Sequence, residues 1–119
     1  MKIRVAEILN MKEALQRLVQ KEIPISTSFK LVKFTKQVND KLIDIENSRI
    51  QLVTKFGTKN EETGEIHVDK DKTNDFMKEI NNLFQEEVDI EFDQIRIEDF
   101  GNISISTSDI ILLKSIIKN

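Results

Sequence analysis

A continuous helical pattern between residues 28 and 56 limits what this chain can fold into more than any other feature. Apolar residues recur there every three or four positions, which places them along one side of an α-helix. The first stripe comprises Leu31, Phe34, Val38, Leu42, Ile45, Leu52 and Phe56. A second stripe on the same helix comprises Phe29, Val32, Ile43, Ile50 and Val53. A helix with two apolar stripes requires partners on two of its sides.

The length of this predicted helix does not fit easily inside one small domain. At 1.5 Å per residue, positions 28–56 extend over about 43 Å. A compact domain of this size has a radius of gyration of about 13.5 Å, and hence a diameter of roughly 35 Å. Either the helix breaks, with Asn47-Ser48 as the expected position, or a second subunit covers the excess. We favour the second subunit.

The whole chain, residues 1–119, predicts a single mostly helical α+β domain with about four helices and a small antiparallel sheet. Helical spacing predicts further helices over positions 6–20, 76–84 and 110–117. Alternation of polar and apolar residues predicts strands at 2–5, 65–68 and 88–97, the last with a bulge at Gln94. We expect the first strand to pair with the strand near 88–98.

Particular residues indicate where these helices begin and end. Pro24 is expected to stop the first helix, because proline disfavours helical conformation in the residue before it. The hydroxyls of Ser26-Thr27-Ser28 are expected to cap the long helix, and Gly57 to end it with a positive φ. Asp69 or Asp71 is expected to cap the third helix, and residues 106–109 the last one.

Charge is distributed unequally along the chain. Residues 1–57 carry 11 Lys/Arg and 6 Asp/Glu, a net charge of +5, whereas residues 58–119 carry 7 and 15, a net charge of −8. Either the two halves pack on each other and their charges meet at the rims, or the charges attract a second subunit or another partner.

The composition argues against several classes of site. The chain has no cysteine and one histidine, which argues against disulfides and zinc and indicates a reducing compartment. No apolar run approaches the roughly 20 residues of a membrane span. We therefore expect no cofactor, no metal and no membrane partner, and we expect a cytoplasmic protein without an enzyme active site.

Three groups of residues carry candidate chemistry, each with a simpler alternative. His67 is interpreted as a solvated strand residue, and the run 69–75 lacks the glycine and the final glutamate of a calcium loop. Asp89, Glu91 and Asp93 lie on one strand face, where they either are solvated, bind a partner or hold a cation. A metal-assisted enzyme built on these three residues is the weakest of the functions considered.

Basic residues of the long helix form the other candidate set. Lys30, Lys33, Lys36 and Lys41 form a basic cluster without interleaved Tyr or Trp, so a solvated face is favoured over nucleic-acid binding. Arg49 occupies a position of the first stripe at which the helical spacing predicts an apolar residue. It either meets a carboxylate across an interface, sets the helix register, or extends to solvent.

Several segments resemble a family of small phage and prophage proteins of low-GC Gram-positive bacteria. The resembling segments are Met1–Val5, Leu15–Leu18 followed by Glu22–Ile25, Ile50–Gly57, Glu87–Phe92 with Ile95–Ile97, and Ile105–Leu113. The resemblance implies a viral origin and a location in the cytoplasm of the bacterial host or in the virion. The function of that family is unknown, so the resemblance supplies no catalytic residues.

These observations predict a non-enzymatic phage protein that self-associates through its long helix and binds protein. The expected partner-binding residues are Arg49, Ile50, Val53, Phe29, Val32, Asp89, Glu91 and Asp93. The expected partners are a second copy of the chain and a host or phage protein. The alternative is an inhibitor or sponge that blocks a host enzyme or an anti-phage defence factor.

Overall fold

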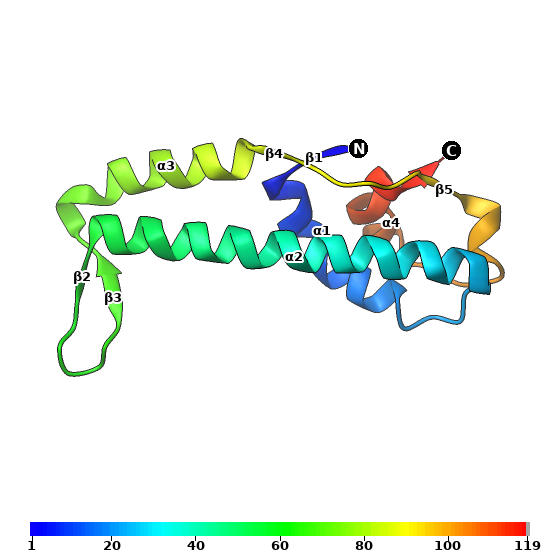
Figure 1. Cartoon of the computed structure of the whole chain (residues 1–119), viewed down its shortest axis with the longest axis horizontal. Coiled ribbons are helices and arrows are strands. Elements are labelled where there is room, and N and C mark those ends of the chain that lie inside the picture. Colours follow the sequence, from blue (N-terminus) through cyan, green and yellow to red (C-terminus); the bar gives the residue numbers. More distant parts are fainter. Residues whose placement is uncertain (119) are drawn as a thin grey trace.

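The computed structural model describes residues 1–118, which form four α-helices and three two-stranded ladders (Figure 1). The helices are α1 (Val5–Leu18), α2 (Ile25–Phe56), α3 (Thr73–Gln85) and α4 (Thr107–Leu113). The strands are β1 (Lys2–Arg4), β2 (Gly57–Lys59), β3 (Ile66–Val68), β4 (Glu87–Asp89), β5 (Ile95–Arg96) and β6 (Ile117–Lys118). Short 3-10 turns cover Lys70–Lys72, Ile97–Phe100 and Lys114–Ile116. The fold is α+β and mostly helical, as the sequence predicts.

Helix α2 is unbroken over 32 residues and determines the shape of the molecule. The alternative of a break at Asn47-Ser48 is wrong. Neither residue disfavours a helix by more than about 0.7 kcal/mol, and the helix interior contains no glycine or proline. The principal extents are 53, 27 and 25 Å, and the radius of gyration is 17.7 Å. A compact chain of this length would have a radius of gyration of about 13.5 Å, so the molecule is elongated along α2.

The hydrophobic core lies along one side of the first two thirds of α2. Helix α1 and the segment that follows β4 pack on the first stripe there, and Leu31, Phe34, Val38 and Ile45 of that stripe are buried. Helix α1 contributes six buried residues to this core: Val5, Ile8, Met11, Ala14, Leu15 and Leu18. Beyond Ile45, no residue of α2 is buried.

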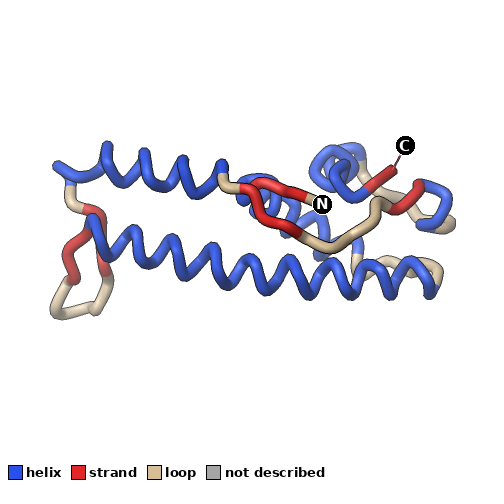
Figure 2. The backbone as a smooth tube through the Cα atoms, turned by 45° about the horizontal axis from the view of Figure 1, so that its top comes forward, coloured by secondary structure: helices blue, strands red, loops and turns tan. Residues whose placement is uncertain are grey.

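The last third of α2 forms an arm with α3 and the β2–β3 hairpin. Helix α3 runs back along α2 in the opposite direction, and the hairpin projects from the far end (Figures 1 and 2). The ring centroids of Phe56 and Phe76 lie 6.3 Å apart, and Ile80 is the buried residue of α3. The arm therefore has only a thin apolar layer, between two helices.

The ladders confirm the expected strand pairing and correct the extent of one predicted strand. β1 pairs with β4 in antiparallel orientation, with Ile3 opposite Val88, as predicted. The expected strand over 88–97 is instead two strands with different partners, because β5 pairs in parallel with β6. The change of alternation before Ile95 therefore marks the passage from one ladder to the other and not a bulge at Gln94.

The end of the chain also differs from its prediction. Helical spacing predicts a helix through residues 110–117, but α4 ends at Leu113. A 3-10 turn follows, and Ile117 then adopts an extended conformation beside Ile95. The tertiary pairing with β5 therefore overrides the local helical pattern.

The predicted N-cap of α2 is wrong, whereas Gly57 is its C-cap as predicted but without the expected positive φ. The N-cap position is Pro24, and residues 26–28 lie inside the first turn. There the buried Thr27 donates a hydrogen bond from Oγ1 to the carbonyl of Asp99 at 2.6 Å. This bond attaches the start of α2 to the 3-10 turn Ile97–Phe100. Gly57 has φ −120°, so its conformation does not require glycine. An added Cβ would lie 2.5 Å from the carbonyl oxygen of Val53, so the requirement is steric.

The predicted side-chain cap of α3 is wrong, and the predicted cap of α4 is confirmed. Helix α3 begins at Thr73 without a side-chain cap. Asp69 instead accepts a hydrogen bond from Thr58 Oγ1 at 2.7 Å, which ties it to the hairpin. Helix α4 is capped as predicted, because Ser106 Oγ accepts from the backbone N–H of Asp109 at 3.1 Å.

Candidate partner-binding surface

The second stripe of α2 lies on the side of the helix that no other element covers. Phe29 is 66% exposed, Val32 64%, Ile43 61% and Ile50 47%. Ile25, at the start of the same helix, is 77% exposed. Isolated exposed apolar residues are normal on soluble proteins, but a row of them along one helix face is a candidate binding surface.

The other two predicted residues of α2 occupy different positions. Val53 belongs to the second stripe but is half-buried, near the base of the hairpin. Arg49 follows Ile45 by four residues, so it lies on the side of α2 that faces the core, beyond the point where the core ends. Its guanidinium binds Glu46 of the same helix at 2.6 and 2.9 Å. Arg49 is therefore an exposed residue with an intrahelical partner, outside the second stripe.

A hollow of about 390 Å³ adjoins the second stripe between α2 and the α1–α2 connection. Val19 and Ile23 line it from the connection, and Val32, Lys36 and Asp40 line it from α2. Val32 belongs to both the hollow and the stripe. The apolar surface therefore extends sideways from α2 toward the end of α1.

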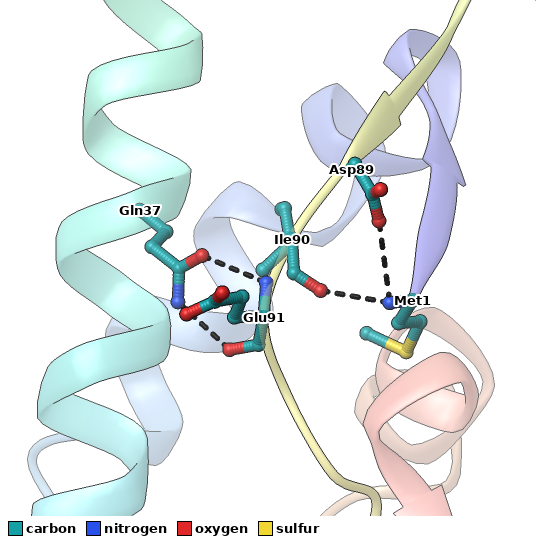
Figure 3. A network of polar contacts seen from close by, with 5 residues as sticks. All are labelled: Met1, Gln37, Asp89, Ile90 and Glu91. Atoms are coloured by element: carbon teal, nitrogen blue, oxygen red, sulfur yellow. Dashed lines mark hydrogen bonds and ion pairs between the residues drawn. The ribbon is translucent and has the colours of Figure 1, made fainter.

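The acidic segment after β4 is held against the middle of α2 by a side-chain amide (Figure 3). Gln37 Nε2 donates to the carbonyl of Glu91 at 2.9 Å, and the N–H of Glu91 donates to Gln37 Oε1 at 2.8 Å. On the other edge, the N–H of Ile90 donates to the carbonyl of Met1 at 2.8 Å, and the amino group of Met1 lies 3.4 Å from Asp89 Oδ1. The Gln37 amide thus occupies the place of a neighbouring strand.

Glu91 and Asp93 face basic residues of α2 across a second hollow. Met1, Lys30, Lys33, Glu91, Phe92 and Asp93 line this space of about 490 Å³. The basic first half of the chain and its acidic second half meet here, which matches the interpretation that the charges of the two halves meet at their rims. Asp89 is separate from this group and lies beside the amino group of Met1.

An ion pair that sequence reasoning missed connects α1 with α4. Arg17 donates from Nε and Nη2 to the two carboxylate oxygens of Asp109 at 2.9 and 2.6 Å. Asp109 is 6% exposed. The hydrogen bonds from Arg17 lower the pKa of this carboxyl, and they outweigh the burial that would raise it. No local pattern could have identified the pair, because the two residues are far apart in the chain.

This ion pair predicts a specific pH dependence of stability. Because folding lowers the pKa of Asp109, the contribution of the pair is present at neutral pH. It is lost as the pH falls below about 4, the ordinary value for an aspartate in an unfolded chain. We expect Arg17→Gln to lower Tm by several degrees at neutral pH and by progressively less toward about pH 3. Thermal unfolding followed by circular dichroism across this range measures the effect.

The matched control is Arg49→Gln, which removes an exposed ion pair within one helix. Such pairs contribute little to stability, so its effect on Tm at neutral pH should be clearly smaller. An Arg17→Gln effect that is equal at both ends of the pH range would contradict the role assigned to Asp109.

Residues with other candidate chemistry do not form a site in the described part of the chain. His67 is exposed in the hairpin, with Nε2 3.3 Å from Glu65. Within residues 1–118, no three His, Asp or Glu side chains converge as metal ligands would. None of the helices described is long and apolar enough to cross a membrane.

A third hollow of about 450 Å³ lies near the end of the chain and is mainly apolar. Ile97, Phe100, Ile103, Ile105, Ile110 and Ile117 line it, together with Lys114 at its rim. Sequence reasoning missed it, because it forms only where the 3-10 turn Ile97–Phe100, the connection that follows it, α4 and β6 meet. Its lining contains no pair of groups suited to acid–base catalysis.

Comparison of the chain with protein families, with curated proteins and with solved structures finds no significant match.

Proposed function

We propose that this protein is a non-enzymatic protein of phage or prophage origin that self-associates through α2 and acts by binding protein. One observation carries the proposal: the second stripe of α2 is exposed along the helix, while the first stripe is covered by the chain itself over residues 31–45. The resemblance to small phage proteins supports the viral origin.

Burial of the exposed apolar side chains of α2 would stabilise a complex of two chains. Full burial of a Val, Ile or Phe side chain contributes about 1.5–3 kcal/mol. Four such side chains of α2, Phe29, Val32, Ile43 and Ile50, are each at least 47% exposed. Pairing with a second chain buries them on both copies at once. A symmetric dimer is the commonest solution for such a self-complementary surface.

The experiment is light scattering after size exclusion, at low and at high salt. We expect an oligomer at both salt concentrations, because apolar contacts are not screened by salt whereas contacts between exposed charges are. The double variant Ile43→Asp/Ile50→Asp should elute as a monomer, because a dimer would bury four added carboxylates.

The control is Ile97→Asp/Ile111→Asp. Both isoleucines are more than 60% exposed but lie outside α2. We expect this variant to keep the wild-type mass. A wild-type monomer under both conditions would contradict self-association and favour the alternative, an inhibitor that covers the surface of a host or defence protein.

A further inference from the structure

We propose that two copies pair through α2 in antiparallel orientation, with the two-fold axis close to position 41. This inference rests on the self-association proposed above and specifies its geometry. It follows from the spacing of exposed residues on α2 and from the places of two charged residues among them.

The exposed face of α2 has the seven-residue period of a coiled coil. Phe29, Lys36, Ile43 and Ile50 are spaced by seven and are all exposed. Val32, Asn39, Glu46 and Val53 form a second series with the same spacing, and only Val53 of these is half-buried. The first series corresponds to a positions and the second to d positions, which together form the contact line between paired helices. This seam coincides with the second stripe and includes the polar residues that interrupt it.

An antiparallel register centred on position 41 matches each a residue with a d residue of the second copy. Residues at equal distances before and after this position meet across the axis. Phe29 then faces Val53, Val32 faces Ile50, and Asn39 faces Ile43. The remaining match brings Lys36 opposite Glu46. In this register apolar residues meet apolar residues near both ends of the seam, and the two charged residues have opposite signs.

A parallel dimer in register lacks this complementarity. It places Lys36 against Lys36 and Glu46 against Glu46 inside the contact line, where like charges are destabilising. A single polar residue at an a position commonly determines the register and orientation of paired helices. Lys36 and Glu46 therefore select the antiparallel orientation.

The contact that Glu46 makes within the single chain leaves it free to pair with Lys36 of a second copy. Glu46 binds Arg49 in the single chain, but both side chains are about half exposed. Exposed ion pairs contribute little to stability, so Glu46 can accept Lys36 of the second copy without a large loss. Asp40 is at an e position, which flanks the contact line, so its two copies approach each other near the axis and form one like-charged contact. It lies at the rim of the seam, beside Lys36 and Lys41.

The hollow beside the second stripe supports the same arrangement. Val32 and Lys36 line both the seam and this hollow, and Val19 lines its opposite side. A second α2 seated on the seam also covers the open side of the hollow. The partner helix would then contact the end of α1 as well as α2.

Disulfide formation between single-cysteine variants tests the orientation, because the natural chain has no cysteine. Val32→Cys and Ile50→Cys proteins are mixed, one of them labelled with ¹⁵N, allowed to exchange and oxidised. Mass spectrometry then distinguishes the mixed disulfide from the two homodisulfides. In the antiparallel dimer, the two copies of either position lie about 27 Å apart along the helices. A disulfide needs Cα atoms within about 7 Å, so we expect at least a tenfold excess of mixed disulfide.

Each outcome has a separate meaning when the molar mass of the unmodified protein is also measured. A dimer that yields mainly homodisulfides would be parallel, and a dimer without crosslinks would use another surface. Both results overturn the antiparallel pairing but leave self-association intact. A monomer without crosslinks overturns the proposed function itself. The control mixture is Ile50→Cys with Glu62→Cys at the exposed hairpin tip, which should show no excess of mixed disulfide.

Discussion

Replacement of Phe34 by alanine is expected to lower the free energy of unfolding by about 3–5 kcal/mol, a large part of the stability of a domain this size. Phe34 is fully buried at the centre of the core. Its ring centroid lies 4.6 Å from that of Phe92, which follows the segment held by Gln37. The substitution removes the ring contact between α2 and this segment and leaves a cavity that the neighbouring helices close only in part.

Urea unfolding followed by circular dichroism measures this loss. The control is Ile111→Ala on α4, because Ile111 is 62% exposed. Its effect should stay within about 0.5 kcal/mol, since exposed substitutions seldom exceed this value. Equal losses for both variants would mean that Phe34 does not occupy the centre of the core.

Replacement of Gly57 by alanine is expected to displace the β2–β3 hairpin from the end of α2. The added Cβ would lie 2.5 Å from the carbonyl oxygen of Val53 and 2.6 Å from that of His67. Backbone atoms on both sides cannot move apart without disturbing the pairing of Gly57 with Val68. We expect a loss of about 3 kcal/mol, the upper end of the usual range for overpacking.

Amide hydrogen exchange is the appropriate measurement, because the damage should be concentrated in the arm. Protection should fall for β3 and for the last turns of α2, while α1 keeps its protection. Gly64→Asn is the control: Gly64 has a positive φ of 74°, which asparagine tolerates, and nothing lies within 4 Å of an added Cβ. If both variants exchange alike, the proposed steric role of Gly57 is wrong.

Local patterns identified most elements of this fold. The spacing of apolar residues predicted α1, α2 and α3, and alternation predicted β1, β3 and β4. These predictions succeeded because a residue's neighbours at three, four or two positions determine which side chains share a face. The predicted N-cap of α2 failed because Thr27 bonds to Asp99, and the positive φ expected at Gly57 failed because its constraint is the close approach of Val53 and His67.

The candidate surface was predictable only in part. Sequence spacing separated the two stripes of α2 correctly, but spacing alone cannot tell which stripe the same chain will cover. Helix α1 and the segment after β4 pack on the first stripe, whereas Phe29, Val32, Ile43 and Ile50 stay exposed. Arg49 was included among the partner-binding residues because of its place in the first stripe. In the structure, Arg49 lies outside the second stripe and its guanidinium binds Glu46 of the same helix.

The sequence by itself determined the length of α2, its two apolar stripes and the opposite charges of the two halves of the chain. These are properties of neighbouring residues along one backbone, so no other element is needed to produce them. The tertiary structure alone decided that the core ends near Ile45, that β5 pairs with β6, and that Arg17 reaches Asp109. Burial and ion pairing depend on which distant segments meet, and the spacing of residues along a chain does not contain that information.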